Sequence, residues 1–200
     1  IHDCVKQLAK KHKKKVIIFA EDVAASGGYL IACCGDEIYA NQSSIIGSIG
    51  VIYSSFGFTE LISKIGVQRR VYTAGKNKSI LDPFSPENKD DVKRLKNLQG
   101  KLHDHFISFI KLRRGKKIDV KNKDLFTGMF WSGQEALELG LIDGIGQVNS
   151  ILKDRFGNNV KIKEFQNKKR FFDLGNLISI TFEVISNKIE EKMIFKKFGL

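Results

Sequence analysis

The chain is poor in cysteine and contains no long apolar run. Its three cysteines are an odd number and lack CxxC spacing, so they fit neither a disulfide framework nor a zinc site. Two of them, Cys33 and Cys34, are expected to pack in the core as free thiols. No window reaches about 18 consecutive apolar residues, so the sequence predicts no transmembrane helix in this chain.

Acidic residues are also scarce relative to basic ones. The 200 residues include 34 Lys and Arg against 22 Asp and Glu, a formal net charge of +12. Such a balance suits nucleic acid or anionic lipid. The lysines are spread through the chain, however, without an aromatic-interleaved basic motif or a helix-turn-helix signature. We therefore expect a solvated, lysine-rich surface and no nucleic-acid partner, with contact to a membrane surface as the second interpretation.

The chain has enough apolar sequence for one folded domain and a tail. Hydrophobic residues make up 42% of it, which suffices to bury a core. We place the domain at residues 1–157 and the tail at 158–200. In the tail, residues 160–165 alternate like an edge strand, and 174–198 have the pattern of an amphipathic helix. We expect that helix to dock on its own domain or on a neighbouring molecule, and we prefer this interpretation to a helix that lies on a membrane.

A serine stands where an apolar run gives way to a helical pattern. Residues 16–20 form a short apolar run typical of a buried strand, and the spacing becomes helical from Ser26 onward. The free N–H groups and the dipole at a helix start favour negative charge, which suits an oxyanion. Gly27 and Gly28 have no side chains, so a substrate backbone can approach closely. Ser26 is therefore a candidate nucleophile, and the alternative is an ordinary N-cap.

A serine nucleophile needs a base, and the sequence offers few. Two histidines, His2 and His12, lie in the charged N-terminal segment. The other two, His103 and His105, lie on a long polar helix, where we expect them to face solvent. A lysine can replace histidine when desolvation lowers its pKa. Lys76 and Lys78 lie between a predicted strand at 67–73 and the apolar residues 80–81, a plausible desolvating site. The alternative is that both are surface lysines in a polar turn.

Three motifs, in this order, resemble one family of peptidases. They are ASGGY at 25–29, GSIGVI at 47–52 and TAGKNKSILDPFSP at 73–86, and residues 125–143 resemble that family's closing segment. Over about residues 15–147 the chain resembles the signal peptide peptidase A / protease IV family of Ser-Lys peptidases. The resemblance implies that Ser26 is the nucleophile, that Lys78 is the general base, and that the Ser48 hydroxyl orients the lysine.

The resemblance also implies a mechanism and a setting. Neutral Lys78 takes the proton of Ser26, the N–H of Gly27 helps to hold the oxyanion, and an acyl-enzyme forms and is hydrolysed. The substrates would be membrane-derived leader (signal) peptides or similar apolar peptides, with no metal and no cofactor. The partners would be copies of the same chain in a homo-oligomeric ring, with serine and lysine supplied by neighbouring subunits. The protein would be associated with the bacterial inner membrane, and the resemblance does not say on which side. Its pH optimum would lie above neutral, because Lys78 must lose its proton.

Alternating strand and helix patterns predict an α/β domain. The resemblance implies a ClpP/crotonase-like β-β-α superhelix. Family members carry a Pro-Gly-Gly turn ahead of the nucleophile, which supplies a second oxyanion N–H. No such turn precedes Ser26, so we expect the N-terminal part of the domain to lie outside this chain. The pattern further predicts a helix from 85 to about 115 and a capping box at Ser132 and Glu135.

Two other functions remain open from the sequence. The first is a crotonase-type acyl-CoA enzyme. Such enzymes have glycines at a helix start and a stretch similar to residues 32–40 of this chain. Such an enzyme would leave Ser26, Ser48 and Lys78 unexplained. The second is a catalytically inactive relative that acts as a scaffold for membrane proteins. The candidate residues are intact at all three positions, which favours the peptidase over both.

Overall fold

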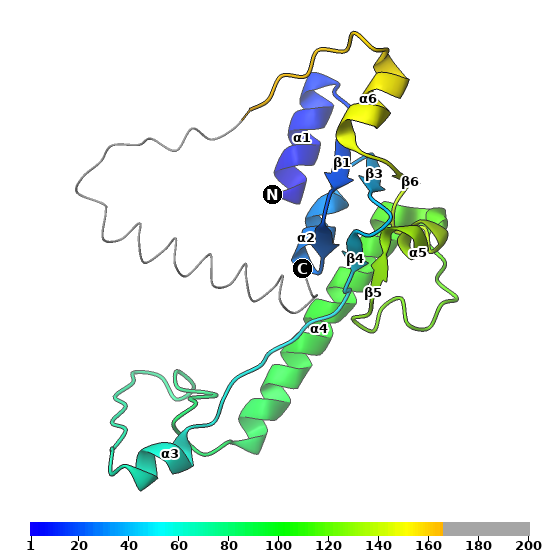
Figure 1. Ribbon diagram of the computed structural model, residues 1–200. Helices are drawn as coiled ribbons and strands as arrows, with labels where there is room; N and C mark the ends of the chain where they lie inside the picture. Colours follow the sequence, from blue (N-terminus) through cyan, green and yellow to red (C-terminus); the bar gives the residue numbers. More distant parts are fainter. Residues whose placement is uncertain (166–200) are drawn as a thin grey trace, which may run out of the picture. The chain divides into compact units, whose positions relative to one another are not determined.

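The structure is a computed structural model that describes residues 1–165 of the chain. Two compact units follow from the contacts within the chain, Ile1–Val160 and Lys161–Leu200, and each is described by itself. The amphipathic helix expected within 174–198 lies outside the described residues. The domain boundary after residue 157 therefore stays a prediction. All elements described below belong to the first unit, whose helices and strands are labelled in Figure 1.

Two three-stranded sheets form the centre of the fold (Figure 1). The first sheet is parallel throughout and has the order β1 (Ile17–Ala20), β3 (Glu37–Ala40) and β6 (Gly144–Ile145). The second has the order β2 (Val23–Ala25), β4 (Ile45–Gly47) and β5 (Phe130–Ser132), with β2 and β4 parallel and β5 antiparallel to β4. β1 and β2 thus enter different sheets before a helix follows, and β3 and β4 do the same. This repetition confirms the predicted α/β fold built from β-β-α units.

Six α-helices and one 3₁₀ helix are present among residues 1–165. Their bounds are α1 (His2–His12), α2 (Gly27–Ala32), α3 (Thr59–Lys64), α4 (Lys89–Arg114), η1 (Gly115–Lys117), α5 (Gly133–Glu138) and α6 (Val148–Phe156). None of them is both long and apolar enough to cross a bilayer. The N-terminal segment is helical, since α1 begins at His2.

The first strand and the helix that follows it confirm the pattern around residues 16–32. The β-branched and aromatic run becomes β1, and α2 begins directly after Ser26. The intervening polar pair, Glu21 and Asp22, is exposed, but it separates two strands rather than ending the sheet structure. The second strand, β2, has only three residues, too few for a periodic pattern to show.

The long helix α4 starts later than predicted. Asn88 is its N-cap and accepts a hydrogen bond from the backbone N–H of Asp90 at 2.8 Å. Residues 82–85 instead form a turn, in which the N–H of Ser85 donates to the Asp82 carbonyl. The helix ends at Gly115, as predicted, with φ at +55°. Only its C-terminal half is buried in the core, at Phe106, Ile110 and Arg114.

The strand predicted at residues 67–73 is wrong. These residues have no strand pairing and are exposed, with Tyr72 at 90% relative exposure. They belong to a segment between β4 and α4, residues 51–88, which we call the arm. In Figure 1 the arm leads from β4 to the N-terminal end of α4, and its part around α3 lies away from the two sheets. An alternating sequence forms a stable strand only beside a partner strand, and in the described residues none lies next to it.

The core lies between the sheets, α2, α5 and the C-terminal half of α4. Its fully buried large side chains include Tyr29, Ile38, Ile46, Ile110 and Leu141. Cys33 and Cys34 are buried there as free thiols, as predicted. The predicted capping box is also present: the Ser132 hydroxyl accepts from the N–H of Glu135, whose carboxylate accepts from the N–H of Ser132.

Candidate active site

Ser26 lies in a strained turn between β2 and α2. Its backbone has φ +52° and ψ −120°, a conformation that costs a non-glycine residue about 1–3 kcal/mol. The N–H of Ser26 donates to the carbonyl of Gly47 at 2.7 Å, which fixes the turn. The residue is exposed, and although it occupies the N-cap position its hydroxyl makes no capping hydrogen bond. The structure therefore does not support the alternative that Ser26 is an ordinary cap.

The glycines after Ser26 leave space beside its hydroxyl. A Cβ added to Gly27 or to Gly28 would meet no atom within 4 Å. The N–H groups of these residues belong to the first turn of α2, where no carbonyl lies four residues earlier in the helix. Such N–H groups can donate to an oxyanion that forms on a carbonyl attacked by Ser26.

Ser48 lies beside Ser26 because their strands are neighbours. Ala25 of β2 is paired with Gly47 of β4 in a parallel register, so each serine is the first residue past its strand. Ser48 is half-buried and also has φ +52°. Its N–H donates to the carbonyl of Met129 at 2.8 Å. The structure thus brings two of the three predicted catalytic residues to the same edge of one sheet.

Lys78 lies elsewhere, in the arm. Its side chain is exposed, as is that of Lys76, and the neighbouring Ile80 is exposed too. The expectation that apolar residues desolvate Lys78 is therefore wrong for a single chain, since the arm provides no cover for it. The N–H of Lys78 donates to the carbonyl of Gly75 at 3.2 Å, which closes a local turn. Within one chain, the structure does not bring Lys78 to Ser26.

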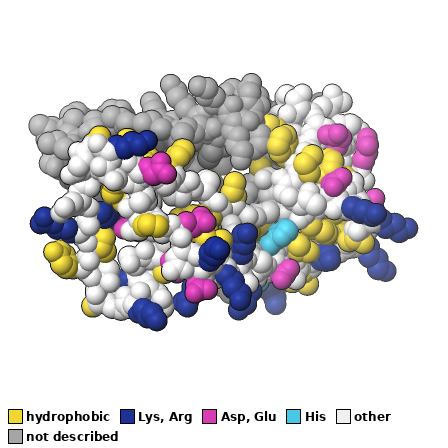
Figure 2. Space-filling view, turned by 90° about the horizontal axis from the view of Figure 1, so that it is seen from below, with side chains coloured by type: hydrophobic (Ala, Val, Ile, Leu, Met, Phe, Trp, Pro, Cys, Tyr) yellow, Lys and Arg dark blue, Asp and Glu magenta, His cyan; other side chains and the backbone are white. Residues whose placement is uncertain are grey.

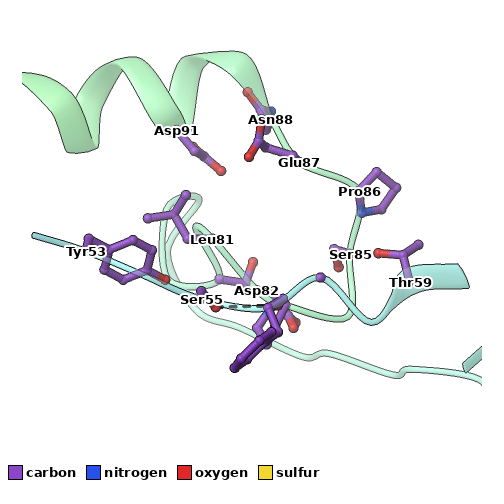
Figure 3. Close-up of a pocket in the computed structure, with 14 residues that line it drawn as sticks. Tyr53, Ser55, Thr59, Leu81, Asp82, Ser85, Pro86, Glu87, Asn88 and Asp91 are labelled. Carbon is purple, nitrogen blue, oxygen red and sulfur yellow. Dashed lines mark hydrogen bonds between the residues drawn. The ribbon is translucent and has the colours of Figure 1, made fainter. Parts of the chain in front are cut away.

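A pocket of about 380 Å³ opens in the arm, close to Lys78 in sequence (Figure 3). The residues that line it are mostly polar and include Ser55, Ser79, Asp82, Ser85, Glu87 and Asp91. The carboxylate of Asp82 accepts from Arg69 and from the N–H of Phe84, so it is already paired. Ser26 and Ser48 do not line this pocket, which is therefore not the site of the two serines.

His103 was expected to face solvent, and this expectation is wrong. It is half-buried, and its Nε2 lies 3.0 Å from the carbonyl oxygen of Ile49, the residue after Ser48. His105 is exposed, as predicted. The sequence signal was present in the spacing: His103 is three residues before Phe106 and seven before Ile110, on the face of α4 that enters the core.

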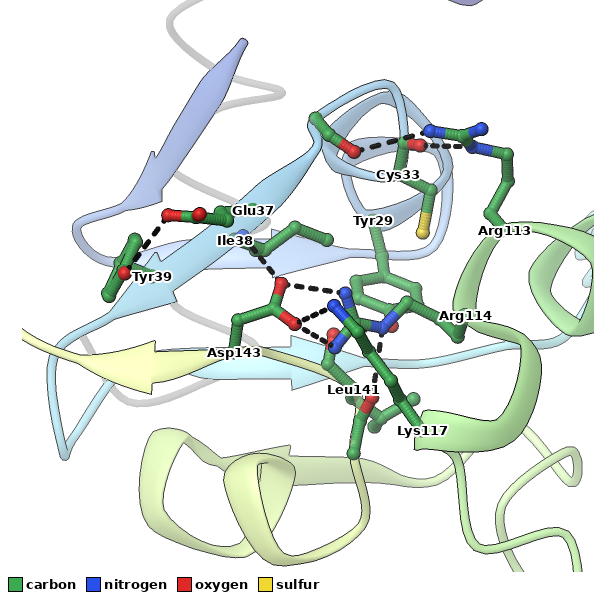
Figure 4. A network of polar contacts seen from close by, with 12 residues as sticks. Tyr29, Cys33, Glu37, Ile38, Tyr39, Arg113, Arg114, Lys117, Leu141 and Asp143 are labelled. Carbon is green, nitrogen blue, oxygen red and sulfur yellow. Dashed lines mark hydrogen bonds and ion pairs between the residues drawn. The ribbon is translucent and has the colours of Figure 1, made fainter. Parts of the chain in front are cut away.

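A network of polar contacts holds the far end of α2 (Figure 4). The hydroxyl of Tyr29, which is fully buried, donates to the carbonyl of Leu141 at 2.7 Å. Arg113 of α4 donates to the carbonyl of Cys33 at 2.8 Å and to that of Gly35 at 3.3 Å. Burial raises the pKa of the Tyr29 hydroxyl well above its usual value. These contacts fix the helix that begins at Ser26.

Asp143 is at the centre of this network. Its carboxylate accepts from Arg114 at 2.8 and 3.1 Å, from Lys117 at 2.6 Å and from the N–H of Ile38 at 2.8 Å. Burial raises the pKa of Asp143, but these hydrogen bonds lower it by more than burial raises it, to about 2. The sequence did not reveal that Arg114 and Asp143 pair, because they lie 29 residues apart and their pairing depends on the tertiary fold. No cluster of His, Cys, Asp or Glu suited to a metal ion occurs within residues 1–165.

Comparison with known proteins assigns this arrangement to a family. The model of peptidase family S49 matches residues 8–159, which include Ser26, Ser48 and Lys78. The chain belongs to peptidase family S49. The recognition made from the three motifs is thereby confirmed.

The relatives of this S49 chain have different names. It is 56% identical to a protein of Brucella abortus named Na(+)/H(+) antiporter NhaA, over 83% of this chain and 22% of that protein. It is 29% identical to a putative signal peptide peptidase SppA of Enterococcus faecium, over 88% of this chain and 54% of that protein. A structure of the 1510-N membrane-bound stomatin-specific protease with a substrate peptide is 21% identical, covering 76% of this chain and 57% of that one, with a TM-score of 0.42. The chain thus spans about a fifth to about a half of these curated relatives.

Proposed function

We propose that the chain is the catalytic part of a serine endopeptidase that uses a Ser-Lys dyad. The observation that carries the proposal is the turn at Ser26 in an S49 chain: a strained, exposed serine whose hydroxyl caps no helix, with Ser48 on the neighbouring strand. Backbone strain of this kind is common at catalytic residues because it presents a side chain that a relaxed turn would not. Ser26 is the nucleophile in this proposal.

Lys78 is proposed as the general base, supplied by a second copy of the chain. Its arm is exposed and carries large apolar side chains on its surface, among them Ile52, Phe56 and Tyr72. A second copy that covered the arm would desolvate Lys78 and lower its pKa, which a lysine base requires. The proposal therefore places the dyad between subunits of a homo-oligomer.

The reaction is acyl transfer in two steps. Lys78 takes the hydroxyl proton of Ser26 while Ser26 Oγ bonds to the peptide carbonyl carbon, and the N–H of Gly27 donates to the oxyanion. The peptide C–N bond then breaks, and Lys78 gives its proton to the leaving amine. Lys78 then takes a proton from a water molecule, whose oxygen bonds to the ester carbonyl carbon. The bond from that carbon to Ser26 Oγ breaks, Lys78 returns the proton to Oγ, and the acid leaves. Ser48 donates to or accepts from the Lys78 amine and so orients it.

The substrates we propose are leader peptides left in a membrane, or other apolar peptides, and the setting is the bacterial inner membrane. The name of the Enterococcus relative supports the substrate class, since that protein is a putative signal peptide peptidase. A membrane surface is a partner in this proposal, and the basic chain suits anionic lipid. Figure 2 shows Lys and Arg side chains spread over the visible face, with hydrophobic side chains between them.

Ion exchange is the second candidate, because the relative of 56% identity has an antiporter name. That alignment covers 83% of this chain, so it includes most of the residues that the S49 model matches. It covers 22% of the relative itself. The shared segment is thus the S49 segment, which favours a peptidase for this chain.

A fluorophosphonate probe tests the proposal on the intact protein. We expect the probe to label Ser26, as located by mass spectrometry, and labelling to disappear in Ser26→Ala and in Lys78→Ala. Lys76→Ala is the matched control, an exposed lysine in the same turn, and should be labelled like the wild type. Loss of labelling in Lys76→Ala but not in Lys78→Ala would move the base. An oligomeric, folded wild type without any label would overturn the peptidase and favour the scaffold, the acyl-CoA enzyme or the antiporter.

A further inference from the structure

The turn at Ser48 is built from residues that leave it little freedom. Ser48 has φ +52°, and the N–H of Gly50 donates back to the Ser48 carbonyl at 2.9 Å. The Ile49 side chain between them is fully buried. A Cβ added to Gly50 would lie 3.0 Å from the Cα of Gly128, so another backbone segment presses against the turn. The position of the Ser48 hydroxyl therefore depends on what holds this turn.

Two hydrogen bonds from distant parts of the chain hold it. On one side, the carbonyl of Met129 accepts from the N–H of Ser48 at 2.8 Å. On the other, Nε2 of His103 lies 3.0 Å from the carbonyl oxygen of Ile49. A carbonyl oxygen only accepts, so His103 Nε2 carries the proton and donates. The Met129 contact is between backbone atoms, and the His103 contact is made by a side chain that a substitution can remove.

We propose that His103 is a positioning residue for Ser48. The Nε2–H of His103 fixes the carbonyl of Ile49. Because Ile49 follows Ser48 directly, this hydrogen bond also holds the Ser48 hydroxyl at the position where it contacts the Lys78 amine. His103 does not touch the reacting atoms, and no hydrogen bond joins it to Ser26 or Ser48 among the described residues. The inference rests on the proposed function, since it assigns His103 to the same dyad.

The place of His103 on α4 gives this contact a second consequence. The helix starts at Lys89, directly after the arm that carries Lys78, and its C-terminal half is buried in the core. His103 therefore joins the Ser48 turn to the one helix that leads to the arm. At about 1.5 Å per residue, the helix start lies about 20 Å from His103, so the contact fixes the helix rather than Lys78 itself.

Three variants separate a positioning role from ordinary packing. His103→Leu removes the donor, His103→Gln restores an N–H at similar reach, and His105→Leu is the matched control on the exposed side of the same helix. The readouts are the rate of fluorophosphonate labelling at Ser26 and the separate values of kcat and KM for peptide cleavage by the intact protein. We expect His103→Leu to lower the labelling rate and kcat about 10- to 100-fold with KM unchanged, because small misplacements of a catalytic group have effects of this size. His103→Gln should recover most of the rate.

A double-mutant cycle makes the test specific to Ser48. If His103 acts through the Ser48 hydroxyl, His103→Leu should slow labelling little further in a Ser48→Ala background. A packing defect would instead lower the rate by the same factor in both backgrounds and would overturn the inference. Should His103→Leu not fold, as judged by its melting temperature, His103→Asn takes its place, since its amide is too short to reach Ile49.

The remaining outcomes separate this inference from the proposed function. A wild type labelled at Ser26 together with an equally fast His103→Leu would overturn the role of His103 and leave the peptidase standing. A His103→Gln as slow as His103→Leu would likewise contradict a role for the donated hydrogen bond. A wild type without label would remove the proposed function, and the role of His103 with it.

Discussion

At the scale of single residues, the site depends on two serines in an unusual backbone conformation. Ser26 and Ser48 both have φ +52°, and both come directly after a strand of the same sheet. Left-handed backbone is unfavourable for serine, so the surrounding hydrogen bonds must hold each turn. The carbonyl of Gly47 does this for Ser26, and that of Met129 does it for Ser48. The two turns are therefore coupled, because Gly47 and Ser48 are adjacent in the chain at the end of β4.

Gly47 provides a test at this scale. It has φ +102°, and an added Cβ would lie 2.9 Å from Cδ1 of Trp131 and 3.3 Å from the Met129 carbonyl oxygen. Gly47→Ala should lower the free energy of unfolding by about 1–3 kcal/mol and slow labelling of Ser26, because it displaces the residue between the two turns. Urea denaturation and the labelling rate measure the two effects.

Gly100→Ala is the control for that substitution. Gly100 lies within α4, and a Cβ added there would meet no atom within 4 Å. It should raise the free energy of unfolding by about 0.5–1 kcal/mol and leave labelling unchanged, as alanine does at a helix interior. Equal stability of the two alanine variants would contradict the account of Gly47.

At the scale of elements, a buried ion pair holds the C-terminal end of α4. Arg114 of α4 contacts Asp143, which in turn accepts from the N–H of Ile38 in β3. Both side chains are largely buried, at 5% and 12% exposure, so removing either partner would leave a charge uncompensated. The pair fixes the C-terminal half of α4, and Tyr29 and Arg113 fix α2 beside it.

The pKa of Asp143 gives a pH dependence with a definite sign. Burial raises this pKa, but the hydrogen bonds from Arg114, Lys117 and the Ile38 N–H outweigh burial and lower it from an ordinary value of 3.8 to about 2. The depressed pKa contributes stability that is present above pH 4 and is lost as the pH falls through 2, about 2 kcal/mol in total. In urea titrations, Asp143→Asn should be less stable at pH 7 by about 3–5 kcal/mol and should lack this part of the acid-induced loss.

Asp104→Asn is the matched control for the acid titration. Asp104 is exposed on α4 and carries none of the contacts made by Asp143. Its variant should follow the wild-type stability profile. A loss between pH 4 and pH 2 in Asp143→Asn as large as that of the wild type would show that Asp143 is not its source.

Local sequence patterns correctly predicted the elements whose formation depends on residues close by in the chain. The first strand, the helix after Ser26 and the capping box at Ser132 follow from periodicity and capping. The strand at 67–73 was predicted wrongly because its alternating residues have no partner strand among residues 1–165. His103 and Asp143 were missed as contacts because their partners lie 54 and 29 residues away. The motifs predicted Ser26 and Ser48 for one site, and the structure places both directly after paired strands. Motif order along the chain cannot show that Lys78 lies in a separate arm.

At the scale of the whole molecule, the proposed dyad requires a second copy of the chain. One chain holds Ser26 and Ser48 at a sheet edge and Lys78 in an exposed arm. Oligomers with closed symmetry repeat one contact around a ring, so every serine can meet the lysine of a neighbour. A monomer with all three residues would then be inactive, and activity would depend on protein concentration.

The measurement that tests this claim most directly mixes two inactive variants. Ser26→Ala and Lys78→Ala are dissociated, combined in equal amounts and reassembled as the intact protein, and peptide cleavage is compared with wild type treated alike. Each variant alone should be inactive, and the mixture should regain about one quarter of wild-type activity, because a quarter of the random neighbour pairs join an intact Ser26 to an intact Lys78. A mixture as inactive as its components, beside a fully active reassembled wild type, would contradict a dyad shared between copies.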